Sequence, residues 1–254
     1  MRAVLFALAL VGAGCSFPVE GTFMNRALPE AASRPRTIVI IFNHGFASET
    51  AGTYESRLPP ILVMAGERND DVVVFAQVRN TSRLNTLDHA SYIEAAVEHF
   101  ERTHGIPRRN IILAGQSCGG WGSLQAAAFT YPEIGGVVAF APTCHGKLPY
   151  STEIRQRRLG EIGQLAQRAR FPGLIFVYEG DSYYSLADWT EFSRNVAGVA
   201  GLRVERLDRD RVLQVCARCG RDSHGAVWGA GFGEAFYDSH LRPLIERVRE
   251  RVRS

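Results

Sequence analysis

A short motif between two apolar segments constrains the fold of this chain more than any other feature. Gly115-Gln116-Ser117-Cys118-Gly119 follows the apolar run at residues 110–114 and precedes an apolar stretch of helical character at residues 121–129. This order predicts a strand, a sharp turn and a helix. The residues two before and two after the serine must lack side chains that would collide in such a turn. The pattern therefore predicts that Ser117 is presented outward as a nucleophile.

A serine nucleophile needs a base and an acid, and candidates for both follow downstream. Residues 173–178 predict a buried strand, and Asp181 lies in the turn after it. Residues 211–215 predict a further strand or its extension, followed by a loop that carries His224. Histidine suits this position because its pKa lies near neutral pH. We predict a triad of Ser117, His224 and Asp181, with Asp188 as the alternative acid.

With these residues in place, the sequence resembles the α/β-hydrolase superfamily, and within it the dienelactone-hydrolase-like and feruloyl-esterase-like serine esterases. The resemblance runs from about residue 38 to the C-terminus. It rests on His44-Gly45-Phe46 after the first strong strand, on the turn at Ser117, and on Asp181 and His224 in the order nucleophile, acid, histidine. One position departs from the pattern, because relatives often place the acid where this chain has Tyr183.

The resemblance also implies an oxyanion hole made of two backbone N–H groups. One belongs to Phe46, and the other belongs to Cys118 at the positive end of the following helix. Two amides aimed at a developing negative oxygen favour acyl transfer. Neither a metal nor an organic cofactor is implied. His44 is predicted to shape the oxyanion turn rather than to act as a base, and His89, His99 and His104 are predicted to face solvent.

The remaining chain alternates strands and helices, which predicts a mainly parallel sheet with helices on both faces. The expected strands are 37–42, 71–77, 110–114, 136–140, 174–178 and 202–207, and the expected helices are 53–65, 85–103, 120–131, 185–196 and 234–253. Right-handed crossovers bring the loops after the strands to one edge, where the site residues meet. Residues 142–172 hold a helical pattern, which we interpret as a crossover helix rather than a cap over the site.

Length and composition indicate one enzyme domain. A chain of 254 residues that is 46% hydrophobic can bury a full α/β core, and its formal charge of +3 gives no nucleic-acid signature. Tyr150, Tyr183, Tyr184 and Trp189 are candidates for lining an acyl or aromatic pocket, or for packing alone. The sequence leaves substrate identity, preference for ester over amide, and oligomeric state open.

The N-terminus predicts export. Residues 1–14 combine one positive charge, a short apolar core and small residues before Cys15, as in a secretory signal. The small residues resemble a lipoprotein cleavage site, so we expect a periplasmic or cell-envelope protein, anchored to the membrane if Cys15 is lipidated. Residues 15–36 are either a tether or an added edge strand, and residues 37–254 form the predicted hydrolase domain.

Export changes how the other cysteines are interpreted, because oxidising compartments favour disulfides. Cys118, Cys144, Cys216 and Cys219 allow three pairings. Cys216 with Cys219 would close a small loop before His224, and Cys118 can meet Cys144 from the neighbouring strand end. A zinc or redox role for Cys216 and Cys219 lacks a supporting second pair.

These features together predict an exported serine hydrolase that cleaves a carboxylic ester through an acyl-enzyme intermediate. The substrate is expected to be a small-molecule or polymer-linked ester. A peptidase or an acyltransferase would use the same residues. A catalytically silent binding lipoprotein with the same fold is the alternative from another class of protein.

Overall fold

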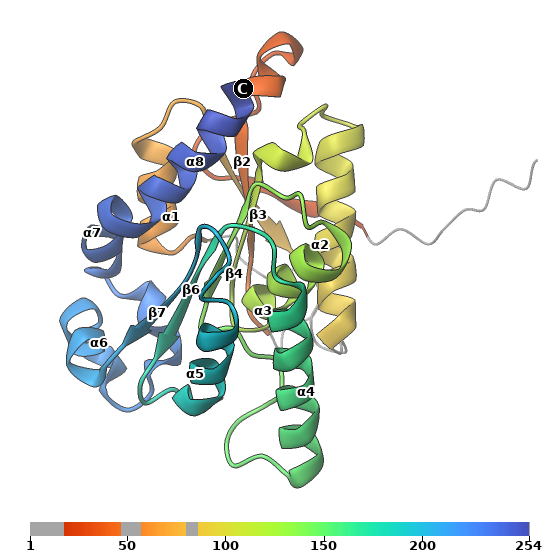
Figure 1. Ribbon diagram of the computed structural model, residues 1–254. Helices are drawn as coiled ribbons and strands as arrows, with labels where there is room; N and C mark the ends of the chain where they lie inside the picture. Colours follow the sequence, from red (N-terminus) through yellow and green to blue (C-terminus); the bar gives the residue numbers. More distant parts are fainter. Residues whose placement is uncertain (1–17, 47–56, 80–85, 254) are drawn as a thin grey trace, which may run out of the picture.

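The sheet at the centre of the molecule places the candidate residues. The computed structural model describes residues 18–46, 57–79 and 86–253 (Figure 1). Seven strands form one sheet in the order β1-β3-β2-β4-β5-β6-β7, in which β2 to β7 are parallel and β1 is antiparallel to β3. The strands are β1 (Glu20–Phe23), β2 (Ile38–Asn43), β3 (Val72–Val78), β4 (Ile111–Gln116), β5 (Gly136–Phe140), β6 (Gly173–Tyr178) and β7 (Leu202–Leu207).

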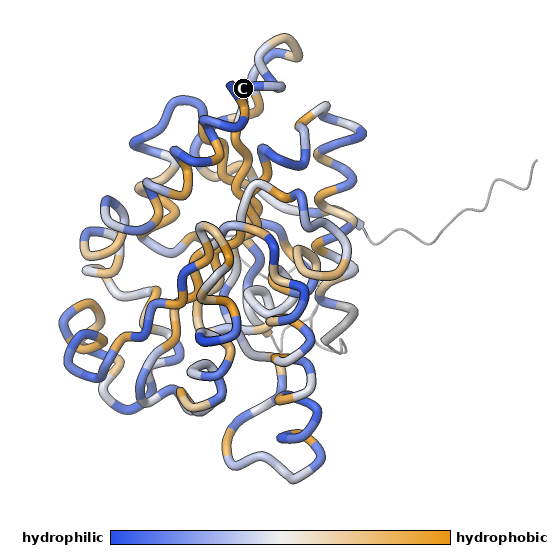
Figure 2. Tube along the Cα trace, in the orientation of Figure 1, coloured by the Kyte–Doolittle hydropathy of each residue, from blue (hydrophilic) through white to orange (hydrophobic). Residues whose placement is uncertain are grey.

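The inner strands are near-continuous apolar runs because both faces of the sheet are covered. Every residue of β2, β5 and β6 is buried. Figure 2 shows this as hydrophobic colour concentrated along the sheet and hydrophilic colour on the outer helices. The six strands expected from the sequence are all present, with ends shifted by no more than two residues. The predicted α/β-hydrolase fold class is confirmed.

Helices cover the two faces of the sheet (Figure 1). Helices α1, α7 and α8 lie on one side, and α2, α3, α4 and α5 lie on the other. The helices are α1 (Pro60–Glu67), α2 (Thr86–Arg102), α3 (Cys118–Gln125), α4 (Thr152–Arg168), α5 (Leu186–Asn195), α6 (Arg209–Val215), α7 (Phe232–Phe236) and α8 (Arg242–Arg253). Two π-helical turns, Ala126–Thr130 and Tyr237–Leu241, extend α3 and join α7 to α8. The helix expected at 53–65 begins at Pro60, and its residues 53–56 lie outside the described residues.

The strand expected at residues 211–215 is wrong, because this segment belongs to helix α6. Asp208 caps the helix by accepting a hydrogen bond from the Arg211 amide at 2.8 Å. Val212 and Val215 are buried three positions apart, which is the spacing of one helix face. A short apolar run fits a strand equally well, so the Asp208 cap is what distinguishes the two.

The segment at residues 142–172 contains the expected crossover helix. Helix α4 connects β5 to β6 and packs against α5. Ser151 caps it, accepting a hydrogen bond from the Ile154 amide. A parallel pair of strands needs a crossover of this kind, so no cap over the site is required to explain the helix.

The N-terminal segment contributes an edge strand. For residues 15–36 the sequence allows either a tether or an edge strand. In the structure, β1 pairs with β3 from Glu20↔Val78 to Phe23↔Phe75, so this segment holds an edge strand. The signal at residues 1–14 and Cys15 lie outside the described residues and stay predictions. Within the described ranges, no helix has both the length and the apolar character to cross a membrane.

Candidate active site

Ser117 occupies a strained turn between β4 and α3. Strand β4 ends at Gln116 and α3 begins at Cys118, so one residue makes the turn. Its backbone angles are φ 57° and ψ −124°, a region that costs a non-glycine residue about 1–3 kcal/mol. The Ser117 amide donates to the Phe140 carbonyl at 2.9 Å, and the Ser117 carbonyl accepts from the Trp121 amide at 2.9 Å. Neighbouring backbone therefore holds this conformation.

Close backbone contacts explain the glycines of the motif. A Cβ on Gly119 would lie 2.0 Å from the Asn43 carbonyl oxygen, and one on Gly115 would lie 2.4 Å from the Gly119 carbonyl carbon. The collisions involve backbone atoms, which cannot turn aside as a flexible side chain does. The spacing read from the sequence thus has the expected steric cause.

The structure brings Ser117, His224 and Asp181 into one hydrogen-bonded chain. Ser117 Oγ lies 2.8 Å from His224 Nε2, and His224 Nδ1 lies 2.8 Å from Asp181 Oδ2. A carboxylate only accepts, so Nδ1 carries the proton of a neutral imidazole and Nε2 accepts from the serine hydroxyl. This is the tautomer that a general base for serine requires.

Asp222 and Ser182, which the sequence did not single out, hold the hydrogen-bonded chain of Ser117, His224 and Asp181 in place. Asp222 accepts from the His224 amide at 3.0 Å and from Ser182 Oγ at 2.6 Å, which ties the histidine turn to the acid turn. Burial opposes its charge, but these hydrogen bonds outweigh burial and lower the pKa of Asp222. Its place two residues before His224, typical of a side chain that bonds a following amide, was the available signal.

Tyr183 holds both the acid and the base in place. Its amide donates to Asp181 Oδ1 at 2.8 Å, which leaves Oδ2 for the histidine. Its ring lies on the His224 ring, with centroids 4.1 Å apart. The residue that stands where relatives often have the acid is therefore part of the support for the acid used here.

Asp188, the alternative acid, lies elsewhere. It is buried and pairs with Arg158, whose Nε donates to Asp188 Oδ2 at 2.9 Å. Arg158 also donates to Thr143 Oγ1 at 3.0 Å. This pair was not predictable from the sequence, because the two residues are 30 positions apart on different helices. The structure thus assigns Asp181, and not Asp188, to the His224 ring.

A pocket opens at Ser117. Its volume is about 410 Å³. Both residues of the predicted oxyanion hole, Phe46 and Cys118, lie on its wall, and Phe46 is 58% exposed. The lining residues are Phe46, Gln116, Ser117, Cys118, Thr143, Cys144, His145, Gly146, Tyr183 and His224. Of the four aromatic candidates from the sequence, Tyr183 belongs to this lining. Tyr150 lies outside it and donates a hydrogen bond to the Tyr183 carbonyl, whereas Tyr184 and Trp189 are buried in the core.

Helix α4 supports the part of the pocket wall that the loop at residues 143–145 forms. His145 receives a hydrogen bond at Nδ1 from Arg158 at 3.4 Å and donates from Nε2 to Glu161 at 3.2 Å. Burial, reinforced by Arg158 and opposed by Glu161, lowers the pKa of His145. Glu161 also accepts from Trp121 Nε1 at 3.2 Å. Residues of the crossover helix therefore fix the loop at 143–145 that lines the pocket.

The expectation that His89 faces solvent is wrong. His89 is fully buried on α2, where its Nδ1 lies 2.9 Å from Arg79 Nη1. Burial first, and then the charge of Arg79, lowers the pKa of His89 to about 3. His99 and His104 contact each other at the far end of the same helix, and both are partly exposed. An amphipathic pattern does not distinguish a buried histidine from an exposed one when the partner that binds the buried ring, here Arg79, comes from outside the helix.

His44 has the structural role expected of it. Its Nε2 accepts from the Arg79 amide at 3.0 Å, and its Nδ1 donates to the Gly45 carbonyl at 2.6 Å. Arg79 also donates to the His44 carbonyl. Burial and the Arg79 charge lower the pKa of His44 to about 3, so the ring stays neutral and both nitrogens are used to shape the turn.

Both disulfides considered from the sequence are present. Cys118 is bonded to Cys144, and Cys216 is bonded to Cys219. The first joins the residue after the nucleophile to the pocket loop that follows β5. The second closes a short turn ahead of the His224 segment. Of the three possible pairings, the structure therefore has the one with the two local bridges.

Comparison with known proteins identifies the fold. No family model and no curated protein matches the sequence. Among solved structures, DcsB in complex with its substrate analogue is 14% identical, with 86% of this chain and 92% of that chain covered and a TM-score of 0.57.

Two esterase structures are similar at the same level. Est1E from Butyrivibrio proteoclasticus with ferulic acid bound is 14% identical, with 92% of this chain and 93% of that chain covered and a TM-score of 0.53. Butyrate-bound Est2 from Thermogutta terrifontis is 16% identical, with coverages of 93% and 89% and a TM-score of 0.53. At such identities the likeness concerns the fold. The chain has the α/β-hydrolase fold that these structures share.

Proposed function

We propose that this protein is an exported serine esterase that cleaves a carboxylic ester in two steps. The observation that carries the proposal is the hydrogen-bonded chain from Ser117 Oγ through His224 to Asp181, with both distances at 2.8 Å and the serine on a pocket wall. A structural serine needs neither a strained backbone nor a buried carboxylate behind its histidine. Both features are costly, and nucleophilic catalysis explains both.

In the first step, His224 Nε2 takes the proton of Ser117 Oγ as this oxygen attacks the ester carbonyl carbon. Asp181 stabilises the imidazolium that forms, and the amides of Phe46 and Cys118 receive the developing oxyanion. His224 then gives its proton to the alcohol oxygen as the carbon–oxygen bond breaks. In the second step, water attacks the acyl-enzyme with His224 again as the base, and the carboxylic acid leaves.

The pocket indicates the kind of ester. A volume of about 410 Å³, walled by Phe46, Tyr183 and the Cys118–Cys144 disulfide, fits a small acyl group of mainly apolar surface. Est1E holds ferulic acid and Est2 holds butyrate. We infer that this protein acts on esters of small aromatic or short aliphatic acids. The predicted signal at residues 1–14 and Cys15 would place this activity in the cell envelope.

The test is hydrolysis of p-nitrophenyl acetate, p-nitrophenyl butyrate and methyl ferulate by the wild-type chain beside Ser117→Ala. We expect turnover by the wild-type protein, a burst of nitrophenol equal to the enzyme concentration when deacylation is slow, and loss of both in the variant. Cleavage of p-nitroanilides at a comparable rate would favour a peptidase, and acyl transfer to added alcohol in preference to water would favour an acyltransferase. A folded wild-type protein without turnover would favour the binding lipoprotein.

A further inference from the structure

The pocket wall next to the nucleophile is a disulfide. Cys118 starts helix α3, Cys144 lies in the loop after β5, and both line the pocket together with Ser117. Cys118 is 6% exposed, whereas Cys144 is half-buried and more accessible. A small molecule that enters the pocket therefore meets a sulfur–sulfur bond, and it reaches the Cys144 side more easily.

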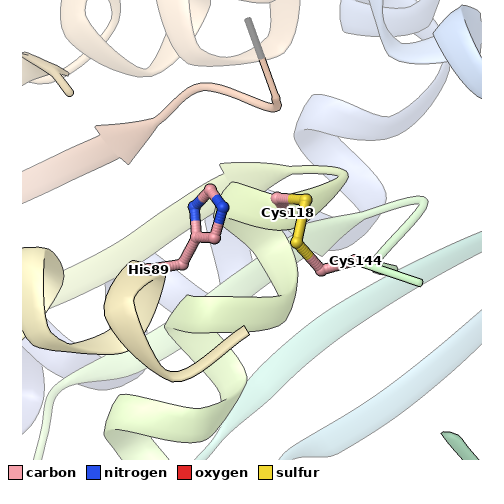
Figure 3. Close-up of side chains that lie close together, drawn as sticks. All are labelled: His89, Cys118 and Cys144. Carbon is pink, nitrogen blue, oxygen red and sulfur yellow. A yellow bond between two sulfur atoms is a disulfide. The ribbon is translucent and has the colours of Figure 1, made fainter. Parts of the chain in front are cut away.

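A buried histidine lies behind this disulfide. Figure 3 shows the His89 ring with one nitrogen toward Cys118, and a ring nitrogen and the two sulfur atoms all lie within 4.8 Å of one another. Arg79 Nη1 contacts His89 Nδ1 at 2.9 Å. A guanidinium only donates, so Nδ1 accepts and the proton of the neutral ring is on Nε2. That N–H has no hydrogen-bond partner among the described residues.

This tautomer decides what the cluster can do. One histidine and two cysteines are ligand types for zinc, but a ring nitrogen that carries a proton has no lone pair for a metal. Removing that proton would require protonation of Nδ1, which faces the Arg79 guanidinium. An N–H aimed at sulfur instead stabilises a thiolate. The cluster thus suits thiol–disulfide exchange.

Two further features favour a thiolate on Cys118 over one on Cys144. Cys118 is the first residue of α3, where the unpaired N–H groups of a helix N-terminus lower the pKa of a thiol. The Arg79 cation lies on the other side of the His89 ring and polarises its N–H. A thiol of lower pKa is the better leaving group in disulfide exchange.

We propose that Cys118–Cys144 is a modification site for small thiols of the cysteine or 2-mercaptoethanol class. The thiolate of the small molecule attacks Cys144 Sγ and forms a mixed disulfide with it. The Cys118–Cys144 bond breaks, and its electron pair leaves on Cys118 Sγ as a thiolate next to the His89 N–H. A second small thiol would then attack the small molecule's sulfur, release its disulfide and leave two reduced cysteines, with two electrons transferred to the protein.

The consequence for activity rests on the proposed function. The mixed disulfide places the small molecule on the pocket wall beside Ser117, where it occupies space that the acyl group needs. Breaking the bridge also frees Cys118, whose amide is a proposed oxyanion donor. Modification therefore stops ester hydrolysis. When the small thiol is removed, the Cys118 thiolate can attack Cys144 Sγ of the mixed disulfide, which restores the bridge and releases the small molecule as a thiolate, so activity should return.

The test uses the full chain carrying Cys15→Ser, in which four of the five cysteines remain and all are bridged. The folded protein is treated with 2-mercaptoethanol, trapped with iodoacetamide and mapped by mass spectrometry. We expect the mercaptoethanol adduct on Cys144 and the alkyl group on Cys118. The Cys216–Cys219 bridge, measured in the same digest, is the internal reference.

His89 variants test the part played by its N–H. With His89→Phe we expect the exchange rate at Cys144 to fall severalfold, because the Cys118 thiolate loses the N–H that stabilises it and a leaving thiol of higher pKa leaves more slowly. His89→Gln, whose amide can donate, should retain most of the rate, and His99→Phe on the same helix should retain all of it. The rate at Cys216–Cys219 should not change in any variant.

The results that would overturn the proposal are specific. An adduct on Cys118 instead of Cys144, no adduct in the folded protein, or equal effects of His89→Phe and His99→Phe would each contradict it. Ester hydrolysis is followed in parallel and should fall in proportion to the adduct. Absence of hydrolysis before treatment would refute the proposed function, whereas the mapping of the adduct would still decide the thiol chemistry.

Discussion

The buried pair Arg158–Asp188 allows a test of how the pocket wall is supported. The Arg158 side chain is 1% exposed and that of Asp188 is 8% exposed, with 2.9 Å between Nε and Oδ2. The guanidinium carbon lies 5.3 Å from the Trp121 ring centroid and 5.8 Å from that of Trp189. Arg158→Met keeps the apolar stem and removes the cation. Asp188 is then a buried charge without its partner, which costs about 3–5 kcal/mol.

The double substitution Arg158→Met with Asp188→Leu separates the charge from the packing. Replacement of both partners by apolar residues of similar size is often neutral or stabilising. We expect the double variant to recover most of the free energy of unfolding that Arg158→Met loses. Urea unfolding at pH 7.5, followed by circular dichroism, measures all four proteins of the cycle. The reasoning would be refuted if Arg158→Met lowered the free energy of unfolding by less than about 1 kcal/mol, or if the double variant were no more stable than Arg158→Met.

Three further predictions follow from individual residues. His44 and His89 have pKa values of about 3 against 6.5 in the unfolded chain, mainly through burial, so the unfolded state binds more protons below pH 6.5. The free energy of unfolding should fall by about 2 kcal/mol per ring between pH 7 and pH 5 in urea titrations, and no change would contradict this. Gly119→Ala forces a Cβ to 2.0 Å from a backbone oxygen and should lower the melting temperature sharply. Gly160→Ala, where the added Cβ meets open space, should raise the melting temperature because it stabilises the fold by about 1 kcal/mol. Asp181→Asn should reduce kcat for p-nitrophenyl butyrate by about 10⁴-fold while the fold is retained, and a reduction below tenfold would exclude Asp181 as the acid.

The sequence was most informative where local sterics and chain order decide the structure. Ser117 could be placed because the turn between β4 and α3 demands glycines at fixed positions, and the distances at Gly119 give the reason. Asp181 and His224 could be placed because parallel strands bring their following loops to one edge. Strand positions could be predicted from apolar runs because both faces of the sheet are covered, so the strands are buried.

Features that depend on long-range partners were not accessible in this way. Arg79 binds the turn at His44 across 35 positions, and Arg158 reaches Asp188 from another helix. Nothing in the local pattern of either arginine distinguishes it from an exposed one. His89 was placed in solvent because its helix is amphipathic, and its burial depends on Arg79 as a partner from outside that helix. Helix α6 was missed because a run of five residues has no resolvable period.

Labelling of the folded protein with a fluorophosphonate tests the central claim most directly. The phosphorus is attacked by an activated serine and by few other groups, so the label reports the nucleophile without any assumption about the substrate. The account predicts one phosphonyl group per chain, mapped to Ser117 by mass spectrometry, and no labelling of Ser117→Ala or of protein unfolded in urea. A folded wild-type protein that takes no label, or that takes it at another serine, would contradict the account.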